Sequence, residues 1–236
     1  ELDLLRTYPA HVLWRGNGGA SGGSTKIDAA DTAGVGLLRS LLRAFALYDE
    51  EVQYCQAMNY VAGLLLMYLS EEQAFQLLVQ LLHGCLLREL YLPGMANLME
   101  HLQELSAQIA RTLPRLSKHL QDNNIDASFY ATQWFMCFGL DQSMPFSMSV
   151  RMLDLICFER SLLPVYRVAL ALLHRGQERL RSLSDMGEIL TELKQLPKAI
   201  DDVEDFFSHD VAQVRVDSAE QHVRRQEERH GRKASV

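Results

Sequence analysis

The chain has 236 residues, enough for one large domain or two small ones, and 48% of them are apolar. It is rich in leucine and poor in Val-Ile-Thr runs, which favours an all-helical protein. The net charge of -7, without a basic stripe carrying interleaved aromatic residues, argues against nucleic-acid binding.

Cysteine and histidine usage argues against disulfides and metal sites. The four cysteines lie in apolar helical contexts without a CxxC pair, and we expect them to be reduced and buried (Cys55, Cys85, Cys137, Cys157). The eight histidines show no His-x-x-x-His spacing. The opening residues lack the basic and apolar regions of a signal peptide. Because the chain starts inside an expected helix, we expect it to be a piece of a longer protein.

The first expected element is the end of a helix over residues 2–8. Pro9 closes it, because the residue before a proline is disfavoured in helical conformation. Asp3 and Arg6 are three residues apart and share a face of this helix. Taken alone, that spacing describes an ordinary surface ion pair.

A glycine- and serine-rich stretch over residues 16–36 predicts a long, flexible loop. Apolar residues then recur on one face from Leu37 to Tyr48, which predicts a helix. Asp49 and Glu50 indicate the turn that follows it.

The apolar stretch from Val52 to Leu69 predicts a buried central helix. Its ten apolar residues from Tyr60 onward are too few to span a bilayer, which needs about 20. The first half would carry a polar face, made of Gln53, Gln56, Asn59 and Gly63. Such residues usually meet water or cap a neighbouring backbone group, so this stretch alone does not assign a function.

The rest of the chain predicts further helices and no convincing strand. Expected helices cover 70–83 (with a capping box at Ser70–Gln73), 95–111, 114–120, 128–138, 145 onward, 163–173 and 186–196, the last capped by Ser184. The spacing shows no regular repeat, which favours an irregular α-helical domain over a solenoid. A break at residues 122–124 is expected to divide two lobes, and a charged tail begins at Val211.

Two motifs occur in order, Asp3-x-x-Arg6-Thr7-x-Pro9 and Tyr54-Cys55-Gln56-x-Met58-Asn59 followed by Gly63. Together they closely resemble the signature motifs of the TBC domain, the GTPase-activating domain for Rab GTPases, which read roughly IxxDxxRTxP and YCQGMNxxAG. Further agreement is found in Tyr91-x-Pro93-Gly94-Met95, Tyr130-Ala131-x-x-Trp134-Phe135 and Arg151-x-x-Asp154. The resemblance covers about Asp3 to Leu196.

The resemblance implies an all-α, two-lobed fold and a dual-finger mechanism. Arg6 would be the arginine finger and Gln56 the glutamine finger, both inserted in trans into the nucleotide site of a GTP-bound Rab. A delocalised guanidinium suits the spread charge of the phosphoryl-transfer transition state. An amide, which both donates and accepts hydrogen bonds, suits the orientation of the attacking water.

The resemblance also implies supporting residues, which are Asp3, Thr7, Tyr54 and Asn59. Asp3, one turn before Arg6, would hold its guanidinium before the partner arrives. Tyr54 and Asn59 would fix the rotamer of Gln56 on its helix. In the later motif, Arg151 and Asp154 would face the GTPase groove, although a structural hydrogen-bonding role for Asp154 is an equal alternative.

The sequence departs from the family pattern at several places. Ala57 stands where the family has glycine, which adds a methyl group where the backbone of a partner could approach. Leu153 stands where the family usually has tryptophan. The family's helices before the first motif are absent, and the insertion after Arg15 is long.

We therefore expect residues 1–236 to be one TBC-like domain without its usual N-terminal helices. Residues 1–124 would form the lobe with both finger motifs, 125–210 a C-terminal helical lobe and 211–236 a charged tail. The resemblance implies a Rab activator in vesicle trafficking, monomeric and without a reaction or cofactor of its own, since GTP and Mg²⁺ belong to the partner. It would be cytoplasmic, or peripheral on endomembranes through the Rab. The alternatives are a module that binds a GTPase or other protein without activating it, and a structural helical scaffold.

Overall fold

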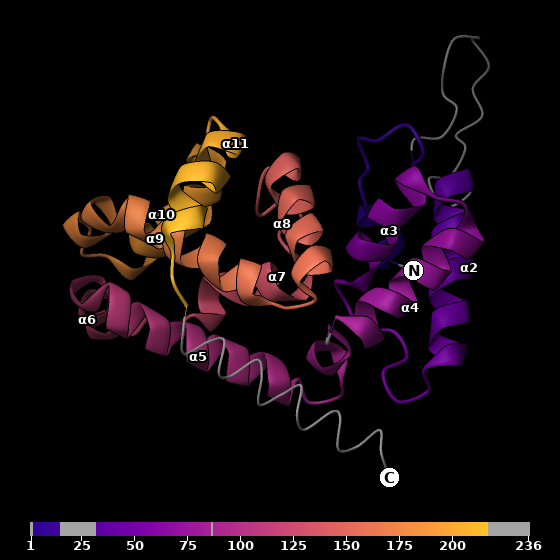
Figure 1. Cartoon of the computed structure of the whole chain (residues 1–236), viewed down its shortest axis with the longest axis horizontal. Coiled ribbons are helices and arrows are strands. Elements are labelled where there is room, and N and C mark those ends of the chain that lie inside the picture. Colours follow the sequence, from indigo (N-terminus) through magenta and orange to yellow (C-terminus); the bar gives the residue numbers. More distant parts are fainter. Residues whose placement is uncertain (1, 15–31, 86, 217–236) are drawn as a thin grey trace. The chain divides into compact units, whose positions relative to one another are not determined.

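The computed structural model describes residues 2–14, 32–85 and 87–216. All regular structure within these ranges is helical and none of it is strand, which confirms the all-α prediction (Figure 1). The chain divides into two compact units, Glu1–Gly84 and Cys85–Val236. The boundary expected near residue 124 falls in a turn inside the second unit, where Asn124 has a φ of 56°.

The first unit is built around one buried helix. Its helices are α1 (Leu2–Arg6), α2 (Ala33–Tyr48), α3 (Met58–Tyr68) and α4 (Glu71–Gly84). The central α3 packs against α2 and α4, and α2 also contacts α1 and α4 (Figure 1). From Met58 to Leu66, every residue of α3 except Tyr60 is buried, so this helix has almost no solvent-facing side over its first two turns. The capping box of α4 is present, with reciprocal hydrogen bonds between Ser70 and Gln73.

The second helix begins four residues earlier than expected, at Ala33, with the Thr32 hydroxyl accepting a hydrogen bond from the Val35 amide. Gly34 lies in the first turn of this helix and packs directly against the backbone of Leu13, which follows the first motif. Its amide donates to the Leu13 carbonyl at 3.2 Å, and a Cβ at this position would lie 2.4 Å from the same oxygen. The part of the expected loop from residue 16 to 31 lies outside the described residues.

The central helix begins at Met58, so the prediction of a helix from Val52 is wrong. The preceding residues form a turn in which Gln53 and Ala57 have left-handed φ angles of 55° and 87°. The Asp49 carboxylate accepts a hydrogen bond from the Val52 amide at 3.1 Å, and its carbonyl accepts one from Gln53 at 2.8 Å. These bonds direct the chain into a turn in place of a helix.

The second unit is organised around its longest helix, α9 (Leu163–Ser182), which extends nine residues past the expected end at Leu173. The other elements are η2 (Leu87–Tyr91), α5 (Ala96–Thr112), α6 (Pro114–Asp122), α7 (Ser128–Met136), α8 (Phe146–Glu159), α10 (Met186–Gln195), η3 (Leu196–Ala199), α11 (Val203–Asp205) and η4 (Phe206–Val211). Of these, α5 to α8, α10, η3 and η4 contact α9.

Two local expectations about this unit are corrected. The cap of α10 is Asp185, whose carboxylate accepts from the Glu188 amide at 3.0 Å, and not Ser184. The helical packing also continues beyond Leu196, because η4 is a π-helical turn that lies on α9 with buried residues (Phe206, Phe207, Val211). The tail from residue 217 lies outside the described residues.

The cysteines are less uniformly buried than expected. All four are free thiols, but Cys55 is half-buried and Cys157 is exposed. Partial burial of its sulfur raises the pKa of Cys157 to about 11, so this thiol stays protonated near neutral pH. No helix in the described ranges combines the length and apolar character needed to cross a membrane.

Candidate functional site

One side chain joins the two motifs that the sequence analysis singled out. The Asn59 amide nitrogen donates to the Thr7 hydroxyl at 2.9 Å and to the Asp3 carbonyl at 3.3 Å. Its amide oxygen accepts a hydrogen bond from the backbone N–H of Ala57 at 3.2 Å. Asn59 is 1% exposed, so these bonds are shielded from water. The segments that carry Arg6 and Gln56 are thereby bonded to a single carboxamide.

Close packing accompanies these hydrogen bonds. Thr7 is fully buried, and its hydroxyl donates to the Asp3 carbonyl at 2.8 Å, which closes the last turn of α1. Tyr8 donates to the Tyr60 carbonyl at 2.9 Å. A Cβ on Gly63 would lie 2.6 Å from the Thr7 methyl carbon, so this glycine lets the first motif lie directly on α3.

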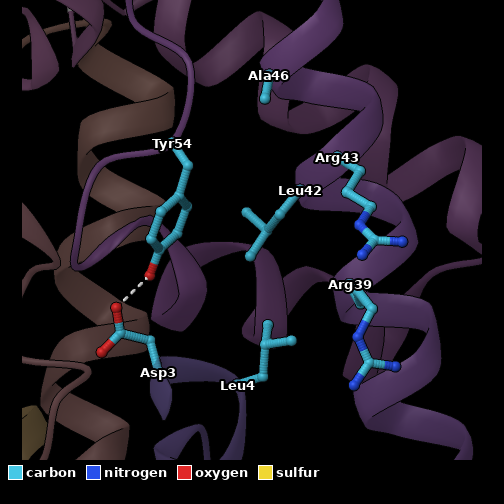
Figure 2. A pocket seen from close by; sticks show the side chains of 7 residues that line it. All are labelled: Asp3, Leu4, Arg39, Leu42, Arg43, Ala46 and Tyr54. Carbon is cyan, nitrogen blue, oxygen red and sulfur yellow. Dashed lines mark hydrogen bonds between the residues drawn. The ribbon is translucent and has the colours of Figure 1, made fainter. Parts of the chain in front are cut away.

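The Asp3 carboxylate accepts a hydrogen bond from the Tyr54 hydroxyl at 2.6 Å (Figure 2). Burial and the neighbouring carboxylate both raise the pKa of Tyr54 well above its ordinary value, so the donor is retained at all physiological pH values. The contact expected between Asp3 and the Arg6 guanidinium is not found among the described residues. Asp3 therefore connects the first motif to the second, in place of holding Arg6.

The two candidate fingers are exposed, in contrast to the buried Thr7 and Asn59. Arg6 ends α1, and Gln56 lies in the turn directly before α3 and not on it. Neither side chain forms a hydrogen bond or ion pair with any described residue. The arrangement thus presents a guanidinium and a carboxamide to solvent from a backbone that buried groups keep in place.

The structure gives a different explanation for the departure at Ala57. Its methyl group is 2% exposed, so it does not face the backbone of a partner, and the expectation of crowding there is wrong. Its φ of 87° lies in the left-handed region that glycine adopts without steric cost. Alanine at this position strains the backbone of this chain, and the strain is held by the Ala57–Asn59 hydrogen bond.

The later motif lies on α8 in the second unit. Arg151 is exposed and forms an ion pair of 3.7 Å with Glu204, which is also exposed. Asp154 is exposed and forms no hydrogen bond with any described residue, so the structural alternative for this residue finds no support. Leu153 is 6% exposed and belongs to the core of the unit.

Three further residues contribute to the site: Asp49, expected from the sequence only to mark a turn, and Arg39 and Arg43, which no sequence motif pointed to. Asp49 is 6% exposed and shapes the turn that carries Gln56; an aspartate after a predicted helix is a signal for such a turn. The two arginines lie on α2 beside Asp3 and Tyr54. No group of three or more His, Cys, Asp or Glu residues within the described ranges is arranged to hold a metal ion.

Residues 1–181 match the family model described as the Rab-GTPase-TBC domain. The chain belongs to this family. The match includes both motifs joined by Asn59, and it confirms the resemblance inferred from the sequence.

Individual relatives support the same assignment to the Rab-GTPase-TBC family. The chain is 33% identical over 216 residues to the human ecotropic viral integration site 5 protein homolog, covering 92% of this chain and 25% of that protein. It is 33% identical over 193 residues to mouse TBC1 domain family member 4, covering 82% and 14%. The chain therefore spans a quarter or less of these two relatives.

Solved structures of the family have the same fold. The Chlamydomonas flagellar RabGAP TBC domain matches with a TM-score of 0.69 and 27% identity, covering 91% of this chain and 65% of that one. The Ypt/Rab-GAP domain of Gyp1p matches with a TM-score of 0.69 and 20% identity, covering 87% and 67%. The latter likeness concerns the fold alone.

Proposed function

We propose that the chain is a GTPase-activating domain for a Rab-type small GTPase, with Arg6 and Gln56 acting in trans on the GTP of the partner. The observation that carries this proposal is the Asn59 carboxamide, which bonds the segments of both residues at once. A shared anchor keeps two separate exposed side chains in register, and two groups that act on one phosphate need such register. Family membership supplies the partner class.

In this proposal each finger has a distinct chemical role. Arg6 neutralises the charge that develops on the phosphate oxygens in a loose transition state, where its planar fork contacts two oxygens together. Gln56 orients the attacking water by donating and accepting hydrogen bonds. Asp3, Thr7, Tyr54 and Asn59 are positioning residues, because they hold the backbone on both sides of the fingers. Arg151 and Asp154 are proposed to contact the GTPase from the second unit.

The chain itself contributes no bound cofactor in this proposal, since GTP and Mg²⁺ come with the partner. The partner is the GTP-bound form of the Rab, and the domain acts as a monomer. Any association with endomembranes is through the Rab, which places the activity in vesicle trafficking. These points follow from the proposed activity and depend on it.

Single-turnover GTP hydrolysis across a panel of purified Rabs tests the proposal. At least one Rab is expected to be accelerated, and Arg6→Ala should reduce that acceleration by about 10³- to 10⁵-fold. Arg6→Lys should be nearly as inactive for want of bidentate geometry. Acceleration that survives Arg6→Ala within about tenfold would overturn the role of Arg6.

The same panel separates the proposed activity from its alternatives. A module that binds without activating would bind a GTP-loaded Rab and leave hydrolysis at its intrinsic rate. A structural scaffold would bind none. The departure from the family pattern at Ala57 would favour the first alternative if its methyl group met the partner, but this residue is buried.

A further inference from the structure

A pocket of about 170 Å³ lies beside the finger segments, within the first unit. It is lined by Asp3, Leu4, Arg39, Leu42, Arg43, Ala46 and Tyr54. One wall of the pocket is formed by Asp3 and Tyr54, which are themselves residues of the two motifs. Asp3 lies three positions before Arg6, and Tyr54 lies two positions before Gln56.

One face of α2 forms most of the pocket. Arg39, Leu42, Arg43 and Ala46 follow one another at the steps i, i+3, i+4 and i+7, which places them on one side of the helix. Leu42 and the Leu4 side chain from α1 are each 6% exposed and form an apolar floor. Figure 2 shows the two arginine side chains along one side of this floor and the Asp3–Tyr54 pair along the other.

The size and chemistry of the pocket limit the kind of group that can bind in it. Sites for cofactors and metabolites usually measure about 300–1,000 Å³, so this pocket fits one large side chain better than a whole small molecule. Two guanidinium groups one helical turn apart favour a carboxylate next to that side chain. Asp3 does not oppose this directly, because it lies on the far wall and accepts from Tyr54.

The net charge of the chain also favours a negatively charged group as the occupant of the pocket. The protein carries a net charge of -7, so a pair of arginines beside an apolar floor is a local reversal of its overall sign. Such a spot steers an acidic partner segment to one place and sets its orientation.

We propose that this pocket is a docking site for the GTPase, and that it receives an aliphatic or aromatic side chain of the GTPase next to one of its carboxylates. This inference rests on the proposed function for the identity of the partner. Arg43 and Arg39 bind the carboxylate, and the apolar side chain lies on Leu4 and Leu42. A GTPase docked there has its surface directly beside the backbone that carries both fingers. The pocket therefore favours those GTPases whose surface has an apolar side chain next to a carboxylate at this place.

The test measures binding and hydrolysis separately on a GTP-loaded Rab from the panel. Arg43→Glu is expected to raise the Kd for the Rab bearing a non-hydrolysable GTP analogue by about tenfold or more, and to lower kcat/KM mainly through KM. Ala46→Leu places a larger side chain in the pocket without disfavouring the helix, and it should also raise Kd and KM. Arg115→Glu is the matched control: Arg115 is an exposed helical arginine on α6 without an ion pair among the described residues, and this change should leave Kd within about twofold.

A charge-reversal scan identifies the opposing carboxylate. Acidic residues of the Rab are changed to lysine one at a time, and one of these changes should restore the binding of the Arg43→Glu variant. Loss of binding without any such rescue would overturn the assignment of a carboxylate. Kd and KM values that stay within about twofold for both pocket variants, with melting curves unchanged, would overturn the pocket itself.

These outcomes are distinct from failure of the proposed function. If the chain binds a Rab without accelerating hydrolysis and Arg43→Glu weakens that binding, the docking site stands and the activation does not. If hydrolysis is accelerated equally by all pocket variants, the activation stands and the docking site does not. A chain that binds no GTP-loaded Rab would overturn both.

Discussion

The Asn59 amide nitrogen and the Thr7 hydroxyl are 2.9 Å apart, and their hydrogen bond joins two segments that are separated by 52 positions in the sequence. The same carboxamide is bonded to Asp3 on one side and Ala57 on the other. Because all its partners are backbone or buried groups, the bonds cannot be replaced by water without moving the chain. The position of each finger therefore depends on one side chain that belongs to neither.

Replacing Asn59 should affect stability and activity together. Asn59→Ala leaves the buried Ala57 N–H unpaired, at about 1–3 kcal/mol, and removes one hydrogen bond each from the Thr7 hydroxyl and the Asp3 carbonyl, which keep the bond between them. The free energy of unfolding should therefore fall by about 2–4 kcal/mol. Stimulated hydrolysis should fall by about tenfold or more at temperatures where the variant is still folded. Asn59→Asp keeps the acceptor for the Ala57 amide but loses both donors, and should also be impaired.

Asn123→Ala is the control for that experiment. Asn123 is a half-buried residue of the second unit whose amide donates to the His119 carbonyl at 2.8 Å. It should lose some stability and keep its full activity. Equal activity of the Asn59 and Asn123 variants would contradict the anchoring role of Asn59.

Gly63→Ala should displace the first motif, because the added carbon would lie 2.6 Å from the Thr7 methyl carbon. We expect a loss of about 1–3 kcal/mol in stability and a clear loss of activation. Thr7→Ser in the same chain removes that methyl group and keeps the hydroxyl, so the double variant should regain part of both. Gly36→Ala is the matched control, since a Cβ there meets no atom within 4 Å, and it should be neutral or stabilising. Chemical denaturation and single-turnover assays measure the two effects.

Ala57→Gly should stabilise the chain. At a φ of 87°, glycine avoids the strain that alanine carries, which is worth about 1–2 kcal/mol. Ala110→Gly, at an exposed position inside α5, should have the opposite sign and cost about 1 kcal/mol. Activation by Ala57→Gly should equal or exceed that of the original chain. A destabilised variant would show that the left-handed conformation of this residue is not its conformation in solution.

Tyr54→Phe removes the hydrogen bond to Asp3 and should weaken activation modestly, because the net value of one such bond is about 0.5–1.5 kcal/mol. The pH dependence is a second readout. Since folding raises the pKa of Tyr54, its contribution is complete below the unfolded pKa, near pH 10, and decreases as the pH rises above it. The original chain should therefore lose stability more steeply above pH 10 than the Phe variant does. Identical slopes would contradict the hydrogen bond from Tyr54 to Asp3.

The role of Gln56 can be distinguished from that of the glutamine in the partner. If Gln56 orients the water, Gln56→Ala should abolish most acceleration and leave binding to the GTP-loaded Rab largely intact. Changing the Rab's own switch glutamine to alanine should preserve much of the acceleration. The control is Gln53→Ala, an exposed glutamine of the same turn, which should be near neutral. The reverse pattern, with Gln56→Ala mild and the Rab variant inactive, would assign the water to the partner.

The helical fold and the two motifs could be predicted because both depend on residues that are close together in the sequence. Apolar residues that recur every three or four positions located most helices, and the motif residues were identified from the sequence itself. The turn before Met58 was missed for a specific reason: Gln53 and Ala57 have no preference for positive φ, so nothing at these positions signals a break. The glycine that the family has in place of Ala57 would have signalled it.

The partnerships within the site could not be predicted in the same way. The spacing of Asp3 and Arg6 correctly placed them one turn apart but could not show that the Asp3 carboxylate accepts from Tyr54. That bond depends on how α1 lies on the turn before α3, and the close approach is permitted by Gly63. Long-range contacts of this kind are set by packing between elements rather than by the residues of either one.

The hydrogen bonds that join the two finger segments connect residues 3–8 with residues 54–60, and none of them involves a residue of the second unit. We call these bonds the joint between the fingers. The joint and the proposed docking pocket both belong to the first unit, so this unit carries the chemistry together with that part of partner choice. Residues in Cys85–Val236, such as Leu153, can therefore be substituted without breaking the joint between the fingers. A chimera with the first unit of this chain and the second unit of a relative would carry the joint over as a single piece.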